Sequence, residues 1–438
     1  MNGEIERKER LDELLDWACA YKGWTRKQLA AHLGRDATHL VPESGNPKSD
    51  FILALSKVLD WPVEATIECI WGDGALGRSA TPAAERARAQ AGGKAPALSF
   101  WEIDALCVAA HRSGDWAKML TAARQELAIA KDANERSVGY LREAGAWNGM
   151  GRYANEAESY RAALAESPIP AERRLLLETN LANCLLHLGR FVEARGVAAD
   201  VLETIQAEKP ESESGRLAEA LAYWVRGESF RMLADREPTS ATSHATKARA
   251  MLATAERLLM EMSRDQGDDS SYSGIAHTAR AGLLHADTIL GRVAAGDAVA
   301  KVMAELDKVV DPEAVPAGDW LESYGWWCVI GAQLALHVPA SADVRRLSAD
   351  DVDRTVAICT MKGHEIADRL GNWAMRQQLF MLEHRRRQRS AGAALSLEDE
   401  WLIDADELRD ILGSIGRFDQ FRRTGWDILR SATIVGAR

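Results

Sequence analysis

The sequence is poor in the residues from which large β-sheets are built. Among its 438 residues, Phe and Tyr occur seven times each, and Val and Ile are sparse beside Ala, Leu, Glu and Arg. Because β-branched and aromatic residues favour strands, whereas the abundant residues favour helices, this usage predicts an all-α fold. The length exceeds what one compact core usually holds, so we expect two or more domains or an extended repeat array.

Long apolar runs and paired cysteines are also absent. No stretch approaches 18 apolar residues, and the first ten residues, MNGEIERKER, contain no apolar core of a secretory signal. We therefore expect a cytoplasmic protein without membrane contact. The six cysteines occur singly and form no CxxC pair, which predicts buried reduced thiols in place of a disulfide framework.

The common motifs of catalysis and cofactor binding are missing as well. No GxxxxGK[ST], GxSxG or GxGxxG occurs in a strand–turn–helix context, and the ten histidines are dispersed. The segment GHEIAD, residues 363–368, lacks the second histidine of a zinc-protease helix. We therefore expect no enzyme, no catalytic residue, no metal and no cofactor.

The chain has no excess of positive charge, and its composition changes at one place. The net charge of −11 means that any contact with nucleic acid must be local. Residues 72–99 are rich in Gly, Ala, Pro and Ser without an apolar period, which is typical of an exposed linker. The sequence therefore predicts an N-terminal domain at 1–72, a flexible linker at 73–99 and a helical domain at 100–438.

Short glycine–aromatic motifs recur in the predicted helical domain. GDW begins at Gly114, GRY at Gly151 and GRF at Gly189, at spacings of 37 and 38 residues, and related triplets begin at Gly371 and Gly416. A glycine in the left-handed conformation can close one helix, and the aromatic residue two positions later can pack into the elbow. The triplets therefore predict a series of helix hairpins.

One unit of this series resembles a tetratricopeptide repeat. In residues 179–202, TNLANCLLHLGRFVEARGVAADVL, the family positions are occupied by Leu181, Gly189, Phe191, Ala194 and Ala198. The resemblance implies an α-solenoid from about residue 100 to 435, whose first helices line a concave groove. Between its degenerate middle repeats, residues 234–247 are expected to form a long inter-helix loop.

The same resemblance suggests where a peptide or protein partner binds. It places Asn183 and His187 on the groove face, with Asn180 beside them, and asparagines in such grooves commonly hold an extended peptide. Trp147 and Asn148 occupy the first helix of the preceding unit. The alternative is that the asparagines are ordinary surface residues.

Two further segments are candidates for contacts. Trp320, Tyr324 and Trp327 share one helix face, which is either an aromatic wall of the groove or core between repeats. The basic cluster HRRRQR, residues 384–389, is either a solvated face or a contact for DNA or an acidic partner. We include Tyr324 and Trp327 among the predicted partner-binding residues.

The N-terminal domain resembles the lambda-repressor-like (XRE) helix-turn-helix family over about 55 residues. The segment TRKQLAAHLG supplies the second helix, with Thr25 as its N-cap, and RDATHL opens the third, recognition helix. Residues 50–64 fit the fourth helix. The resemblance implies contacts between DNA and six residues, with base edges read by the recognition helix: Thr25, Arg26, Lys27, Arg35, Thr38 and His39.

Two features of this domain differ from a typical DNA reader. Pro42 would end or kink the recognition helix after about two turns. Residues 1–72 contain nine Lys and Arg against twelve Asp and Glu, a net charge of −3. A helix-turn-helix that serves protein contact is therefore the alternative to one that reads DNA.

A repressor-like head joined to a tetratricopeptide array resembles the peptide-responsive regulators of bacteria and phages. In those families the array forms a dimer, and a peptide in its groove changes how the heads are spaced on DNA. We therefore expect a transcriptional regulator that binds double-stranded DNA, forms a homodimer and senses a peptide or protein. The alternative is a non-DNA-binding adaptor that assembles a protein complex through its concave face.

Overall fold

The computed structural model describes residues 2–42, 45–71, 98–209, 212–266, 271–315, 318–337, 347–391 and 401–435. Throughout these ranges the chain is helical apart from turns and two strands of two residues each, so the prediction of an all-α fold is confirmed. No helix among them is long and apolar enough to cross a membrane. The chain forms two compact units, one from 1–97 with 391–438 and the other from 98–390.

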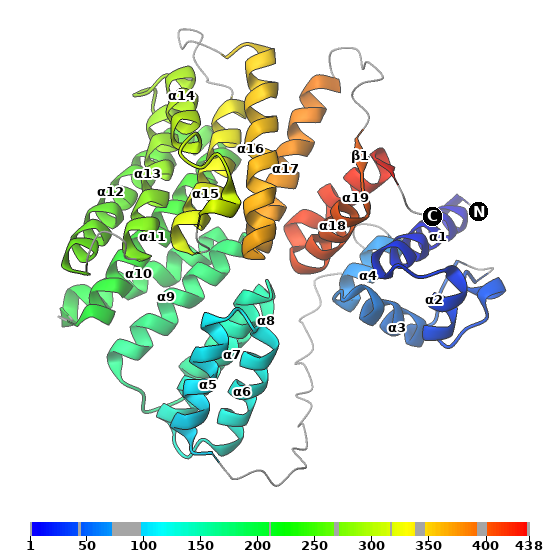
Figure 1. Ribbon diagram of the computed structural model, residues 1–438, viewed down its shortest axis with the longest axis horizontal. Helices are drawn as coiled ribbons and strands as arrows, with labels where there is room; N and C mark the ends of the chain where they lie inside the picture. Colours follow the sequence, from blue (N-terminus) through cyan, green and yellow to red (C-terminus); the bar gives the residue numbers. More distant parts are fainter. Residues whose placement is uncertain are drawn as a thin grey trace. The chain divides into compact units, whose positions relative to one another are not determined.

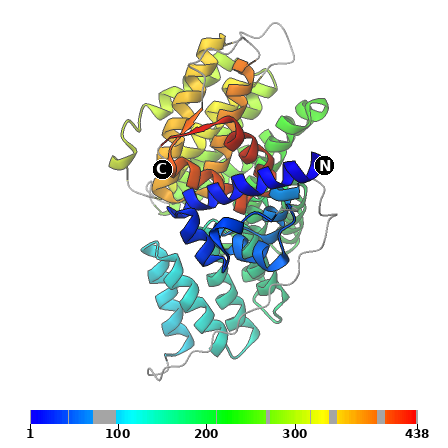
Figure 2. The same cartoon turned by 90° about the vertical axis from the view of Figure 1, so that its right-hand side faces the viewer.

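The N-terminal unit is built from both ends of the chain. Figures 1 and 2 show its C-terminal helices (red) beside α1 and α4 (blue), and the two short strands pair in parallel. Its elements are α1 (Asn2–Lys22), α2 (Arg26–His32), the 3-10 turn η1 (Ala37–His39), α3 (Ser49–Leu59), α4 (Val63–Trp71), β1 (Leu402–Ile403), α18 (Ala405–Arg417), the 3-10 turn η5 (Asp419–Phe421), α19 (Arg422–Ser431) and β2 (Thr433–Ile434).

The prediction that the repeat domain continues to residue 438 is therefore wrong for its last 48 residues. Trp61, which ends the α3–α4 turn, donates its indole N–H to the carbonyl of Leu412 at 2.8 Å. Arg422 pairs with Glu68 at 2.9 Å. Burial of these apolar and polar groups holds α18 and α19 against the first 71 residues. No local sequence pattern predicts this pairing of the chain ends.

The second unit, residues 98–390, is called the repeat unit below because glycine–aromatic turns recur in it. It consists of successive antiparallel helices, as Figure 1 shows for α5 to α8 in cyan. Each helix packs on its neighbours in sequence, and the shared core is formed mainly by Ala and Leu. Its elements are α5 (Phe100–Arg112), α6 (Trp116–Ile129), α7 (Ala133–Gly149), α8 (Tyr153–Ala165), α9 (Ala171–His187), α10 (Phe191–Glu208), α11 (Glu213–Arg236), the 3-10 turn η2 (Pro238–Ser240), α12 (Ala241–Gln266), α13 (Ser271–Ile289), α14 (Ala295–Leu306), the 3-10 turn η3 (Pro312–Ala314), α15 (Asp319–Leu336), α16 (Ala349–Leu370) and α17 (Trp373–Ala391).

Four of the five predicted glycine turns are present. Gly114, Gly151, Gly189 and Gly371 have φ between 62° and 73° and each follows the end of a helix. The residue after each glycine donates its N–H to the carbonyl five positions earlier, at 2.8–2.9 Å, which is the Schellman arrangement. The aromatic residue then begins the next helix. The glycine–aromatic triplets therefore predicted four of the turns between helices correctly.

Other expectations for this region are wrong or lie outside the described residues. Gly416 is inside α18 and has no left-handed conformation, so the fifth triplet lies at the joint between α18 and α19 but its glycine does not close the first helix. Residues 234–247 do not form a long loop, because α11 continues to Arg236 and α12 begins at Ala241 after one 3-10 turn. Almost all of the predicted linker, 73–99, lies outside the part that the structure describes. Five of the six cysteines are buried, as expected, and Cys19 is half-buried.

A substitution at Gly416 tests whether the two ends of the chain pack on each other. A Cβ at this position would lie 2.5 Å from Trp61 Cδ1, so Gly416→Ala is expected to destabilise the protein by about 1–3 kcal/mol through overpacking. The control is Gly196→Ala in α10, where a Cβ meets nothing within 4 Å, and which should stabilise by about 0.5–1 kcal/mol. Urea unfolding followed by Trp fluorescence measures both; equal effects of the two variants would contradict the pairing.

Candidate functional site

The second helix of the predicted DNA-binding region forms as expected. Thr25 caps α2, and a capping box joins it to Gln28: the Thr25 N–H donates to Gln28 Oε1 at 2.8 Å and Thr25 Oγ1 accepts from the Gln28 N–H at 3.3 Å. Leu29 and Ala30 of this helix are buried, whereas Lys27 is exposed. The start of α2 is therefore well defined and partly accessible.

The predicted recognition helix is not formed. Among the described residues between α2 and α3, the only helical turn is η1, three residues long. Gly34 ends α2 with a φ of 65°, and Asp36 Oδ1 accepts from the backbone N–H and the hydroxyl of Thr38 at 2.8 and 2.7 Å. This local bonding competes with a continuing α-helix, and Pro42 lacks the N–H that one would need.

Two of the three predicted DNA-contacting cations are already paired. Arg26 contacts the carboxylates of Asp12 and Asp16, both at 2.8 Å, and Arg35 contacts Asp50 at 2.5 Å. These ion pairs are partly exposed and individually weak, so a phosphate could displace them only at a modest cost. The surface that the sequence assigns to DNA nevertheless presents neutralised pairs. Thr38 and His39 are exposed on η1.

One cavity of the repeat unit lies among six of its helices. Residues from α9, α10, α11, α13, α15 and α17 line it, and its empty space is about 550 Å³, including the part open to solvent. The lining is aromatic and apolar with a few polar groups: Leu186, His187, Phe191, Trp224, Glu228, Arg231, Met232, Thr278, Trp326, Val329, Ile330, Gln333, Ala374 and Gln378.

A buried ion pair supplies the charge in this cavity wall. Arg231 donates from Nε to Glu228 Oε2 at 2.8 Å and from Nη1 to Gln333 Oε1 at 2.6 Å, and its Nη1 lies 3.1 Å from His285 Nδ1. All four side chains are buried. Burial lowers the pKa of His285 to about 4, so its imidazole is neutral at pH 7. Arg231 therefore ties α11 to α13 and α15.

Of the seven predicted partner-binding residues, His187 is the one that lines this cavity. Its ring centroid lies 5.1 Å from that of Tyr153 and 6.2 Å from that of Trp326, and burial lowers its pKa to about 4. Asn180 is half-buried on the same helix, and Asn183 Oδ1 is buried without a hydrogen bond. The predicted groove face of α9 is therefore partly internal.

The aromatic stripe of α15 belongs mainly to the core. Trp327 is 3% exposed and donates its indole N–H to the carbonyl of His277 at 3.0 Å, so its prediction as a partner contact is wrong. Trp320 and Tyr324 flank the His277 ring, at centroid distances of 5.1 and 5.3 Å. The stripe thus packs α15 on α13, which is the alternative stated above. Its neighbour Trp326 reaches the cavity instead.

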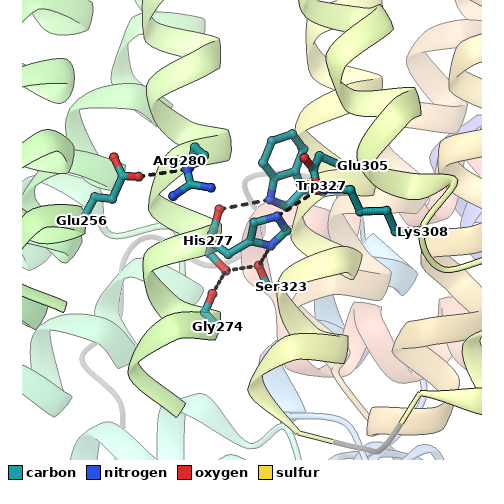
Figure 3. Close-up of polar contacts among 9 residues, drawn as sticks. Glu256, Gly274, His277, Arg280, Glu305, Lys308, Ser323 and Trp327 are labelled. Carbon is teal, nitrogen blue, oxygen red and sulfur yellow. Dashed lines mark hydrogen bonds and ion pairs between the residues drawn. The ribbon is translucent and has the colours of Figure 1, made fainter. Parts of the chain in front are cut away.

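Figure 3 shows that His277 also lies between a serine and a carboxylate. His277 Nδ1 is 2.8 Å from Ser323 Oγ, and Nε2 is 3.4 Å from Glu305 Oε2. This order resembles a hydrolytic triad, but Ser323 is completely buried and already accepts from the Thr278 hydroxyl at 2.9 Å. A substrate has no route to that hydroxyl. The network instead satisfies buried polar groups between α13, α14 and α15.

Trp147 and Asn148 lie on α7, away from the cavity lining. Arg124 stacks over the Trp147 ring at 5.7 Å, and the Asn148 amide donates to Glu156 Oε2 at 3.1 Å. The predicted partner residues therefore fall into three places, α7, α9 and α15. Within the described residues, no group of three or more His, Cys, Asp and Glu side chains could hold a metal ion.

Sequence reading missed the residues that give the cavity its character. Glu228 and Arg231 stand three residues apart in the apolar helix WVRGESFRML, and paired opposite charges in such a segment were a usable signal. Trp224 and Phe191 carried no separate indication of a cavity.

Comparison of the chain with protein-family models, with curated proteins and with solved structures finds no match.

Glu156, the partner of Asn148, gives a test of the electrostatics. Burial raises the pKa of Glu156 from 4.5 to about 8. Between these two values the carboxyl is ionised in the unfolded chain but protonated in the folded one, so the free energy of unfolding decreases as the pH rises. Glu156→Gln should remove this cost: its stability relative to the wild type should increase by up to about 1.4 kcal/mol per pH unit from pH 5 to 8.

The matched control is Glu158→Gln on the same helix, since Glu158 is exposed and pairs with Arg161. Its replacement should change the stability by less than about 1 kcal/mol at each pH, because exposed ion pairs contribute little. Thermal unfolding at pH 5, 6.5 and 8 measures both variants. A difference for Glu156→Gln that is constant over this range would show that the carboxyl ionises normally.

Proposed function

We propose that this chain is a non-enzymatic helical-repeat adaptor, similar to tetratricopeptide proteins, that works through protein contacts and does not read DNA. The observation that supports this most is the single turn η1, which occupies the place of a recognition helix. Three residues of 3-10 helix cannot lie along a major groove as the recognition helix of the repressor family does. The ion pairs of Arg26 and Arg35 weaken the case for DNA further.

In this proposal the two units have different tasks. The repeat unit receives a peptide or protein segment along α9, where Asn180 and His187 are partly exposed and the neighbouring Oδ1 of Asn183, although buried, has no hydrogen bond. The N-terminal unit, closed by α18 and α19, is a second docking module. The residues of its protruding turn, Thr38 and His39, then face a protein.

The alternative is a dimeric DNA-binding regulator in which the repeat unit is the sensor. The capped start of α2 and the exposed Lys27 favour it, because a helix N-terminus with a free cation suits a phosphate. In this case the chain should sediment as a homodimer, and two heads would supply the contacts that one head lacks.

DNA binding by the full-length protein separates the two proposals. We expect fragments of the encoding genome to be retained weakly at roughly 50 mM salt, without preference for any fragment, and released at roughly 200 mM. The double variant Arg26→Ala/Lys27→Ala and the control Lys57→Ala, an exposed lysine of α3, should behave alike. Salt-resistant retention of one fragment that only the double variant loses would overturn the adaptor proposal.

Partner capture tests the repeat unit directly. Full-length protein should co-purify with one protein at equal stoichiometry and without nucleic acid. Asn180→Ala/Asn183→Ala should weaken that complex by about tenfold or more, as expected for central contacts of an interface. Gln206→Ala, an exposed change on α10, is the control and should leave the complex intact. If the double variant still formed the complex with unchanged affinity, the partner would bind at a place other than α9.

A further inference from the structure

Two residues in the wall of the cavity described above carry buried polar atoms without a partner. The indole N–H of Trp224 finds no acceptor, and Glu228 Oε1 finds no donor, within the part of the chain that the structure describes. Such atoms are rare in protein interiors, because a buried donor or acceptor that stays unpaired costs free energy. Their occurrence beside an open space indicates that another molecule bonds them.

The two residues share one face of a helix. Trp224 and Glu228 lie one turn apart on α11. Glu228 Oε1 also lies close to Gly282 of α13, where a Cβ would be 2.5 Å away, and Gly282 is one turn from Thr278 in the cavity wall. One donor and one acceptor are thus available where α11 faces α13. A single hydroxyl group can accept from the one and donate to the other.

The charges of the cavity wall cancel. Among the described residues that line it, the charged side chains are Glu228 and Arg231, which pair at 2.8 Å. His187 is uncharged at pH 7, because burial lowers its pKa to about 4. A charged ligand would therefore lose its hydration without gaining an unpaired counter-charge, whereas a neutral ligand would not.

The rest of the wall suits a flat apolar body. Phe191, Trp224 and Trp326 supply aromatic rings, which pack well against another ring. Val329 and Ile330 add aliphatic side chains. The centres of water molecules could occupy about 50 Å³ of the cavity, several times what one water molecule needs, so there is room for more than a single bridging water.

We propose that this cavity binds a small uncharged aromatic molecule through a hydroxyl group, which accepts the indole N–H of Trp224 and donates to Glu228 Oε1. The ring of the ligand packs against the aromatic wall. Arg231 holds the Glu228 carboxylate through Oε2 at 2.8 Å, which leaves Oε1 for the ligand. This site goes beyond the adaptor function and does not depend on it, because a small molecule and not a protein segment fills it.

The test uses four probes that share one ring and differ in their substituent: benzyl alcohol, toluene, benzoate and benzylamine. In calorimetric titrations of the full-length protein, benzyl alcohol should bind at least about tenfold more tightly than each of the others, as expected for well-placed hydrogen bonds and for the cost of burying a charge. Tighter binding of benzoate or benzylamine, equal binding of toluene, or no binding of any probe at millimolar concentration would overturn the proposal.

Trp224→Phe removes the indole N–H and keeps an aromatic ring in the wall. Its preference for benzyl alcohol over toluene should fall from about tenfold to about twofold, because toluene makes no use of the N–H. The control is Trp101→Phe on α5, which makes the same exchange at a side chain that is 56% exposed and outside the cavity wall, and which should keep the wild-type preference.

An unchanged preference in Trp224→Phe would contradict the role given to the indole. Should this variant fail to fold, the four probes on the wild-type protein still decide the proposal. None of these results depends on whether the chain binds DNA or a protein.

Discussion

One backbone conformation fixes the course of the repeat unit: the left-handed glycine that follows the first helix of a pair. Because Gly114, Gly151, Gly189 and Gly371 have almost the same φ and the same closing hydrogen bond, each second helix starts in the same direction relative to its first. The turns also allow close packing. A Cβ on Gly151 would lie 2.3 Å from Trp373 at the start of α17, so this turn contacts a helix more than two hundred residues away. The turn between α7 and α8 therefore lies directly against the start of α17.

Burial changes the task of the polar residues in and beside the cavity. In an open groove Arg231, Glu228, His285 and Gln333 would face solvent or a partner, whereas here they are buried and must satisfy one another. Removing one member would leave a buried charge or donor unpaired, which commonly costs about 3–5 kcal/mol for an ion pair. The network around His277 does the same between α13 and α15.

Prediction from sequence succeeded where structure is local. Helix content follows from residue usage, and the glycine–aromatic triplets located four helix turns, because both signals depend on neighbouring residues. Prediction was wrong where contacts between distant segments determine the structure. Trp61 packs on Gly416 and Leu412, so the last helices belong with the first, and Gly416 lies in the last turn of α18 instead of closing it. Trp327 and Trp326 are adjacent in sequence, yet one is core and the other lines the cavity; only the packing of α15 on α13 separates them. The prediction of a recognition helix was wrong for a local reason: the Asp36–Thr38 turn, followed by Pro42, does not continue as an α-helix.

The segment after α2 does not form a recognition helix, and the interpretation of the N-terminal unit depends on this. Hydrogen–deuterium exchange of the full-length protein, with and without a saturating pool of genomic DNA fragments, tests it most directly. The amides of residues 36–41 should exchange much faster than those of α3, and DNA should not slow them. Slow exchange across these residues, or protection that appears only with DNA, would mean that a recognition helix exists or forms on binding, and would contradict the account.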